Sequence, residues 1–386
     1  MANNIINSIK FNNIPFFDGT KGFAVIYLSG EFHLFFPYST FTKGWIMHFR
    51  STDGYEWEQM DEAVFVKKSV DSCSAYIQNG KIYLHYLTKN IFGKTDLHLA
   101  ISKDGESFQG YPNALLKNTA LKDIKCFYSN GMRYLIGSET NGDIIPAYSS
   151  IDGAEWVKCD ITCNADEQHM VTYLGAPSPF VAYDGSYVAY SMCGVHIAKS
   201  QFDLTENTLT LQGEVQGFSA DTIRSTMVGE GKPMLFVAKG NALVSLEVYP
   251  TESGLGLRLY REMLKGARKL VDKGVEEGKT QPTEWMRESD ILHLFSLPKE
   301  QGVSLTAGDV SAVIGESGEL SITGEEDIYM DGANLDITLL DMGDMVVLEL
   351  NDCVYPIFTL QSGSVKVGGA QDFSHECYRV RGNYEL

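Results

Sequence analysis

The chain has 386 residues, of which 44% are hydrophobic and 21% charged, as expected for a soluble globular protein with a sizeable core. This composition excludes a disordered chain, and no stretch reaches the roughly 20 apolar residues of a membrane span. The formal net charge of −19 argues against nucleic acid and anionic membranes as partners. The first residues lack the apolar run of a signal peptide, so we expect a cytoplasmic protein.

An Asp-Gly element recurs at a spacing of about 50 residues in the first half of the chain. Its copies are Ser51-x-Asp53-Gly54-x-x-Trp57, Ser102-x-Asp104-Gly105-x-x-Phe108 and Ser150-x-Asp152-Gly153-x-x-Trp156, with a weaker fourth copy at Ser200 and Asp203. Asp-Gly is favoured in hairpin turns in which both central residues have positive φ. We therefore predict a hairpin at each copy, with the following aromatic residue packed under the turn.

A second element lies between these turns and consists of a short strand, a glycine turn and an aromatic-rich strand. Its five turn glycines are Gly30, Gly80, Gly131, Gly185 and Gly231. Each unit alternates apolar and polar residues, and a 50-residue unit has room for four short strands. This is the pattern of a propeller blade. We predict a five-bladed β-propeller, with a β-sandwich or a solenoid as the alternative.

The composition and the hydrophobic pattern of the sequence change after the fifth repeat. The Leu257–Lys273 stretch has the composition of a short helix, and 273–290 is polar, which indicates a linker. From Ile291 onward short alternating strands return, enough for a small β-sandwich. We predict an all-β protein with a propeller over 1–264, a linker that is in part helical over 265–290, and a sandwich over 291–386 with a packing role.

The seven cysteines are scattered, odd in number and without a CxxC pair. Such a pattern predicts free, mostly buried thiols and no structural zinc site. The only close pair is Cys159 and Cys163, and no second cysteine pair accompanies it in the sequence. We expect no metal and no cofactor.

The innermost strand of each blade lines the channel of a propeller, so equivalent positions converge at one mouth. Eight residues before the turn glycines lie Gly22, Ser72, Asp123, Pro177 and Ile223. The positions just before these add Asp71, Lys122 and Asp221, and Arg224 directly follows Ile223. Carboxylates that converge on a pocket suggest glycosidic chemistry, because that chemistry needs two carboxylates at the scissile bond. For each aspartate taken alone, the alternative is a hydrogen bond to a neighbouring backbone N–H.

Several segments resemble glycoside hydrolase family 32, the invertase and fructanase family. GEFHLFFPYSTFTKGWIMHFRSTDGYEW resembles the family's first blade, SCSAYIQNGKIYLHYLT its second, and LKDIKCFYSNGMRYLIGS the stretch around its RDP motif. VYPTESGLGLRLYREMLKGARKL resembles the stretch that leaves its last blade, and LDITLLDMGDMVVLEL a strand of its sandwich. The resemblance covers most of the chain and implies a five-bladed propeller plus a sandwich, a carbohydrate ligand and a retaining β-fructofuranosidase reaction.

The resemblance implies roles for individual residues. Asp123 stands at the RDP aspartate that holds sugar hydroxyls, beside Lys122 in place of the arginine. Asp18 is the nearest match to the family nucleophile. Leu174-Gly175-Ala176-Pro177 stands where the family carries its acid/base glutamate, so an upstream group would have to replace it. The candidates for that group are Glu167 first, then Asp166 and His169.

The resemblance also implies substrate contacts. His48 falls at the histidine of the family's WGHA motif, and Trp45 lies one residue out of register with its tryptophan. With Asp71, Lys122, Asp221 and Arg224 they complete the predicted binding set. We therefore expect a family-32-like glycosidase with an altered site and weak or lost activity.

Two other functions stay open at this point. One is a carbohydrate-binding propeller without catalysis, and the other is a five-bladed glycosidase that acts on arabinosides or xylosides. The Asp-Gly turns also resemble the Asp-box of sialidases, but their spacing and five blades rather than six argue against that family. The oligomeric state is not predicted.

Overall fold

The structure is a computed structural model that describes residues 17–379 apart from 41–42, 91, 139–143, 165–176, 184, 194–195, 230, 240–241, 252–253, 261–267, 270–283, 287–290, 299–301, 309, 316–319, 323–324, 329–333, 342–344, 351–352, 359–363 and 371–372. The chain divides into two compact units, residues 1–250 and 251–386. Within the described ranges, no helical segment has the length and hydrophobicity needed to span a bilayer.

The first unit is built from sheets that follow one another along the chain. The first sheet contains β1 (Ala24–Leu28), β2 (Glu31–Ser39), β3 (Gly44–Ser51), β4 (Glu58–Gln59) and β5 (Val64–Val66). The second contains β6 (Ser69–Gln78), β7 (Lys81–Lys89), β8 (Thr95–Ser102), β9 (Gln109–Gly110) and β10 (Leu116–Thr119). The third contains β11 (Asp123–Ser129), β12 (Met132–Ser138), β14 (Ala147–Ser150) and β15 (Val157–Lys158).

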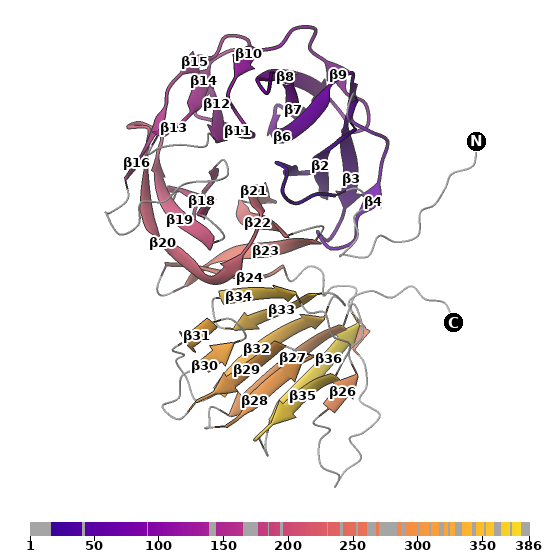
Figure 1. Ribbon diagram of the computed structural model, residues 1–386, viewed down its shortest axis with the longest axis vertical. Helices are drawn as coiled ribbons and strands as arrows, with labels where there is room; N and C mark the ends of the chain where they lie inside the picture. Colours follow the sequence, from indigo (N-terminus) through magenta and orange to yellow (C-terminus); the bar gives the residue numbers. More distant parts are fainter. Residues whose placement is uncertain are drawn as a thin grey trace, which may run out of the picture. The chain divides into compact units, whose positions relative to one another are not determined.

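Two further sheets complete the propeller. The fourth runs in the order β13 (Ile144–Ile145), β16 (Ile161–Asn164), β20 (Thr208–Ser219), β19 (His196–Asp203), β18 (Tyr187–Cys193), β17 (Ser178–Val181). The fifth is β21 (Thr222–Val228), β22 (Lys232–Lys239), β23 (Ala242–Thr251), β24 (Gly254–Leu259). Figure 1 shows these sheets arranged around one axis, with β6, β11 and β21 close to it. The predicted five-bladed propeller is confirmed.

The turn between the first two strands of a blade explains the repeated glycine. Asn79 and Gly80 form the two-residue connection from β6 to β7, and φ is +52° and +70° at these residues. Positive φ at both central residues defines a turn whose twist matches the strands. Asn130 and Gly131 repeat it between β11 and β12, with φ of +49° and +80°. These turns fix where each inner strand ends.

The Asp-Gly copies form a different turn from the predicted hairpin. Only the glycine has positive φ, and β3 ends at Ser51 while β4 begins at Glu58. Asp53 instead accepts hydrogen bonds from the backbone N–H groups of Tyr55 and Glu56, both at 2.8 Å. This side-chain turn caps a longer loop, because an aspartate can satisfy two amides that a hairpin would leave to the opposite strand. Trp57 is buried, as the aromatic position predicts.

The second unit contains two six-stranded sheets. One runs β25 (Arg268–Lys269), β36 (Ser374–Arg379), β27 (Ile291–Pro298), β32 (Asn334–Asp341), β33 (Met345–Leu350), β34 (Cys353–Phe358). The other runs β26 (Glu284–Met286), β35 (Ser364–Gly368), β28 (Ser304–Ala307), β29 (Val310–Ile314), β30 (Leu320–Ile322), β31 (Glu325–Ile328). Buried side chains of both sheets, among them Phe295, Leu339 and Leu305, form one core. The predicted sandwich is confirmed.

The predicted linker contains strands at its described residues. Leu257 lies in β24, Arg268–Lys269 form β25 and Glu284–Met286 form β26, so none of these residues is helical. β25 pairs with β36, and β26 pairs with β35. The rest of 261–290 lies outside the described residues. The domain boundaries predicted at 264 and 291 stay predictions.

Candidate functional site

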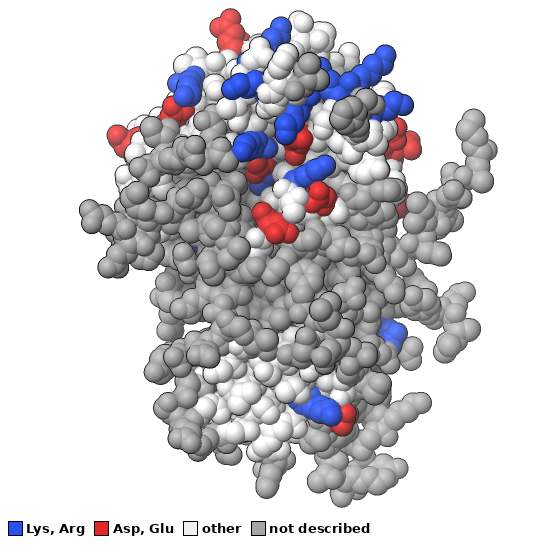
Figure 2. Space-filling view, in the orientation of Figure 1, with Lys and Arg blue, Asp and Glu red and all other residues white. Residues whose placement is uncertain are grey.

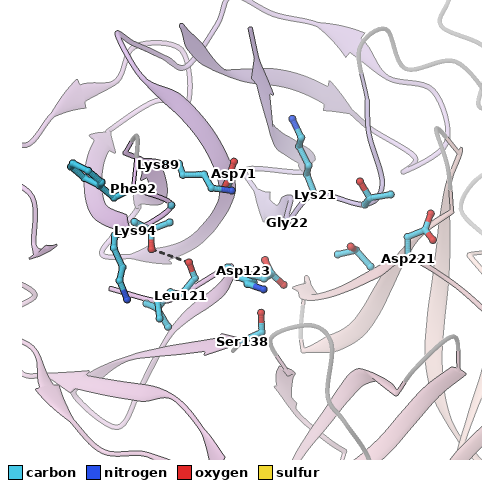
Figure 3. Close-up of a pocket in the computed structure, with 16 residues that line it drawn as sticks. Lys21, Gly22, Asp71, Lys89, Phe92, Lys94, Leu121, Asp123, Ser138 and Asp221 are labelled. Carbon is cyan, nitrogen blue, oxygen red and sulfur yellow. Dashed lines mark hydrogen bonds and ion pairs between the residues drawn. The ribbon is translucent and has the colours of Figure 1, made fainter. Parts of the chain in front are cut away.

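A pocket with a volume of about 690 Å³ opens where the inner strands of the propeller begin. Its lining comes from four blades: Thr20, Lys21 and Gly22; Asp71, Lys89, Phe92, Gly93, Lys94 and Thr95; Ala120, Leu121, Lys122, Asp123 and Ser138; Asp221 and Thr222. Figure 3 shows the side chains of Asp71, Asp123 and Asp221 around this space. The alignment on turn glycines thus placed four residues of the predicted set, these three and Lys122, at one pocket.

Asp123 is held in place by three hydrogen-bond donors. Its Oδ1 accepts hydrogen bonds from Ser72 Oγ at 2.6 Å, from Arg224 Nη2 at 2.5 Å and from the backbone N–H of Ile124 at 2.9 Å. Its side chain is 13% exposed, whereas that of Arg224 is 1% exposed. Donors that converge on one oxygen stabilise the ionised carboxylate and fix its orientation. Asp123 therefore presents a fixed negative charge to the pocket.

Arg224 lies beneath Asp123 and does not line the pocket. Its Nε donates to the carbonyl of Phe23 at 2.6 Å, and its Nη1 donates to the carbonyl of Ile223 at 2.9 Å. A buried guanidinium needs a partner of opposite charge and hydrogen bonds to its other N–H groups, and it has both here. Arg224 thus adjoins the pocket through Asp123, which it positions, and its predicted contact with the substrate stays a prediction.

Gly22 is a residue of the site whose role the sequence did not reveal. A Cβ at this position would lie 1.9 Å from Asp123 Oδ1, 2.1 Å from Ser72 Oγ and 2.8 Å from Arg224 Nη2. Gly22 also forms a parallel bridge to Ser72. Any side chain here would displace the carboxylate. The available signal was the alignment, in which Gly22, Ser72 and Asp123 occupy equivalent positions.

Asp71 and the β7–β8 connection form another side of the pocket. The pairing of β6 with β7 shifts register between Val70 and Ser72, and Asp71 sits in this irregularity. Its Oδ2 lies 3.3 Å from Lys89 Nζ. Lys94 and Phe92 follow in the same connection, and Phe92 is 83% exposed. The sequence alignment missed Lys89, Phe92 and Lys94 because they lie outside the inner strands.

The pocket combines both signs of charge. Lys21, Lys89, Lys94 and Lys122 line it together with the three aspartates. Figure 2 shows basic and acidic side chains interspersed over the described part of the propeller in this view. A chain with a net charge of −19 thus places four lysines around one pocket. Such a lining suits a polar ligand with many hydroxyl groups, or one that carries an anionic group.

His48 is not among the residues that line the pocket, and its predicted contact with the substrate stays a prediction. It is 1% exposed and stacks on Phe35, with ring centroids 4.6 Å apart. Its Nε2 lies 3.0 Å from His33 Nδ1, and burial lowers the pKa of His48 to about 3. His48 lies away from the pocket because β3 is the third strand from the axis and its side chains point to the faces of the sheet.

Trp45 lies on the same strand and is also outside the pocket lining. Its ring contacts Tyr38 and Phe65, with centroids 5.7 and 5.6 Å away. These contacts give Trp45 a packing position in the first blade, and its predicted contact with the substrate stays a prediction.

The two remaining catalytic candidates are placed differently. Asp18 Oδ1 accepts hydrogen bonds from the N–H of Thr20 at 3.0 Å and from Thr20 Oγ1 at 2.6 Å. Asp18 thereby shapes the segment that brings Thr20 to the pocket, but it is not itself among the lining residues. Glu167 lies outside the described residues, as do Asp166 and His169. The roles of all predicted site residues stay predictions.

Comparisons with known proteins point to one family of enzymes. Residues 23–203 match the sequence profile described as "Glycosyl hydrolases family 32 N-terminal domain". The resemblance to glycoside hydrolase family 32 is confirmed. The matched segment includes four inner strands and, with them, Asp71, Lys122 and Asp123. No curated protein sequence matches the chain significantly.

Solved structures of family 32 enzymes share the fold along nearly the whole chain. The β-fructofuranosidase of Bombyx mori is 17% identical, covers 94% of this chain and 90% of its own, and has a TM-score of 0.71. Fructan 1-exohydrolase IIa from Cichorium intybus with 1-kestose is 12% identical, with coverages of 93% and 94% and a TM-score of 0.67. The fructofuranosidase of Schwanniomyces occidentalis with fructose is 12% identical, covers 94% of this chain and 97% of its own, and has a TM-score of 0.67. At these identities the likeness establishes the fold.

Proposed function

We propose that this protein binds a carbohydrate at the channel mouth and hydrolyses β-fructofuranosides there, with a site altered so that activity on natural sugars is weak. One observation carries the proposal: Asp123 is fixed at the pocket by Ser72, Arg224 and the close approach of Gly22. A pre-oriented carboxylate of this kind accepts hydrogen bonds from sugar hydroxyls without a reorganisation cost. Among the similar structures, a variant of the Bombyx mori enzyme is in complex with sucrose, and a variant of the Cichorium intybus enzyme is in complex with 1-kestose.

The rest of the lining supports a sugar ligand. Phe92 offers an exposed aromatic face beside the pocket, onto which the apolar C–H face of a sugar ring can pack. Asp71 and Asp221 add acceptors for hydroxyl groups, and the lysines add donors. The lysines also favour a sugar that carries a negative charge. A panel that includes phosphorylated sugars therefore belongs in the binding experiment.

The reaction would follow the retaining double displacement. In this proposal the Asp18 carboxylate turns from Thr20 toward the pocket and attacks the anomeric carbon. The glycosidic C–O bond breaks, and an acid gives its proton to the leaving oxygen; water then releases the sugar. Asp123 holds the hydroxyls that tighten in the transition state. The sequence has Gly175 and Ala176 where the family carries its acid/base, so Glu167 is the group we assign to the proton. An imperfectly placed acid forfeits part of the ~10²–10⁴-fold that acid catalysis supplies.

The binding experiment measures fructose, sucrose, 1-kestose, arabinose, xylose and sugar phosphates by calorimetry against the full chain. Asp123→Asn removes the charge, and we expect at least a tenfold loss of affinity, about 1.4 kcal/mol. Gly22→Ala should cause a similar loss because its Cβ displaces the Asp123 carboxylate. Glu58→Gln, on the outer strand β4, is the matched control and should leave the affinity for every sugar unchanged. Equal affinity in all variants would place the ligand elsewhere.

The catalytic experiment compares sucrose with a fructoside whose leaving group is a nitrophenolate. The nitrophenolate leaves without protonation, so the activated fructoside should be hydrolysed far faster than sucrose. Asp18→Ala should abolish both reactions, and Glu167→Ala should slow sucrose alone. Robust sucrose turnover that Glu167→Ala leaves intact would show that another acid serves.

Two outcomes would replace the proposal by one of its rivals. Binding of sugar at the mouth with no turnover of either substrate would make the protein a carbohydrate-binding propeller. Preference for arabinosides or xylosides in both assays would make it a pentosidase on the same scaffold.

A further inference from the structure

Three side chains with metal-binding chemistry meet on one face of the sandwich. His293 lies on β27, and His375 and Cys377 lie on the neighbouring strand β36. In the register of these strands His293 is opposite Cys377, and Phe295 is opposite His375. Opposite residues and residues two apart share a face of a sheet, so all of them project from the same side. Phe295 belongs to the core between the sheets, so this is the core-facing side.

The geometry brings the donor atoms together. One ligand atom from each of His293, His375 and Cys377 can be chosen so that all lie within 4.8 Å of one another. His293 Nδ1 and His375 Nε2 are 3.0 Å apart. Tetrahedral zinc with bonds of about 2.0–2.3 Å holds its ligands roughly 3.3–3.8 Å apart. A shift of about 1 Å would therefore convert the contact between these side chains into a coordination shell.

The surroundings keep the donors in a suitable state. His293 is 1% exposed and Cys377 is 8% exposed, whereas His375 is half-buried and leads toward solvent. The buried donors are thus shielded from bulk water, while the half-buried His375 leaves a path by which an ion can enter. Positions on this face otherwise carry apolar residues such as Leu297 and Leu339.

We infer that His293, His375 and Cys377 form a binding site for Zn²⁺, with water as the fourth ligand on the side of His375. Two imidazole nitrogens and one thiolate suit zinc and exclude calcium and magnesium, which prefer oxygen donors. Binding replaces the proton of the Cys377 thiol by the metal and releases that proton to solvent. The site is separate from the sugar pocket and does not depend on the proposed function.

The experiment uses the full chain after treatment with a chelator, titrated with Co²⁺ as a spectroscopic substitute for Zn²⁺. We expect one equivalent to bind with a thiolate-to-cobalt charge-transfer band and the visible bands of a tetrahedral ion, and Zn²⁺ to displace it. Cys377→Ser should remove the charge-transfer band. His375→Gln should weaken Co²⁺ binding at least tenfold. Cys159 is a partly buried thiol of the propeller. Cys159→Ser is the matched control and should leave the charge-transfer band and the affinity for Co²⁺ unchanged.

Clear results would overturn the inference. They are the absence of a charge-transfer band in the unaltered chain, or a band that persists in Cys377→Ser with unchanged affinity in His375→Gln. Circular dichroism of each variant shows whether it is folded. If Cys377→Ser does not fold, the half-buried His375→Gln decides the question by itself, since retention of full Co²⁺ affinity would exclude the site.

Discussion

The propeller and the sandwich contain the same arrangement of rings on paired strands. In the propeller, His33 and Phe35 on β2 lie opposite Arg50 and His48 on β3. The two imidazoles are 3.0 Å apart, nitrogen to nitrogen, and the ring of His48 stacks on Phe35. The loop of the second blade covers them, with the Phe108 ring centroid 5.5 Å from that of Phe35.

In the sandwich the same pattern is formed by different strands. His293 and Phe295 on β27 lie opposite Cys377 and His375 on β36. The nitrogen distance is again 3.0 Å, and the stacked centroids of Phe295 and His375 are again 4.6 Å apart. The fourth residue differs, since a thiol replaces the guanidinium of Arg50. A cation repels a metal ion and a thiolate binds one, so the same pair of histidines is structural in one unit and ligating in the other.

The largest expected effect concerns burial. His48→Ala should destabilise the protein by roughly 2–4 kcal/mol, because it opens a cavity beside Phe35 and leaves His33 without its ring partner. His375→Ala at the half-buried position should cost only about 1 kcal/mol without metal. Urea unfolding in the presence of a chelator measures both. Equal costs would mean that the two arrangements are equally buried in solution.

The next effect is a dependence on acid. Burial lowers the pKa of His33 to about 4 and that of His48 to about 3, from an ordinary 6.5. Because both are lowered in the folded state, their neutral forms stabilise it above pH 6.5, and this stability is lost as the pH falls from 6.5 toward 3–4. We expect a loss of about 1–2 kcal/mol per histidine at pH 5.

The pH dependence is measured by urea unfolding at pH 7 and pH 5. His48→Phe keeps a ring on Phe35 and removes one titrating group, so the difference between the two pH values should shrink. An unchanged difference in this variant would assign the acid sensitivity to other groups.

A smaller effect should follow from moving the third ligand. Arg50→Cys gives the propeller pair the thiol that the sandwich pair has. We expect a second equivalent of Co²⁺ to bind, at least tenfold more weakly than the first because His48 is 1% exposed and covered by the second blade. The cobalt titration measures the stoichiometry. If it stays at one, access rather than the third residue separates the two arrangements.

The smallest effect concerns the ion pair at the edge of the propeller arrangement. Arg50 Nη1 lies 3.6 Å from Glu31 Oε2, and both side chains are partly exposed. Glu31→Gln should change the free energy of unfolding at pH 7 by no more than ~0.5 kcal/mol. A loss above 1 kcal/mol in urea unfolding would show that this pair, rather than ring stacking, holds the strands together.

The five blades and the pocket residues on the inner strands follow from the amino-acid sequence alone. Turn glycines at a spacing of about 50 residues fix where each inner strand ends, and strands of similar length must then begin at one mouth. Asp71, Lys122, Asp123 and Asp221 follow from that register. The type of turn does not follow from the Asp-Gly pair, because Asp-Gly serves both hairpins and side-chain-capped loops, and only the strand ends distinguish them.

Tertiary structure decided what distant strands bring together. Gly22 matters because a strand start from the first blade passes within contact of Asp123; the alignment puts the two at equivalent positions but does not show how closely they approach. The sequence places Arg224 in the binding set at the channel mouth, yet its partner 101 positions away in the chain holds its charge in the interior. His293 and His375 are 82 positions apart, so spacing rules for metal ligands could not find them. Local patterns record the period and the turns, whereas contacts between strands depend on register and sheet order, which the chain fixes only when it folds.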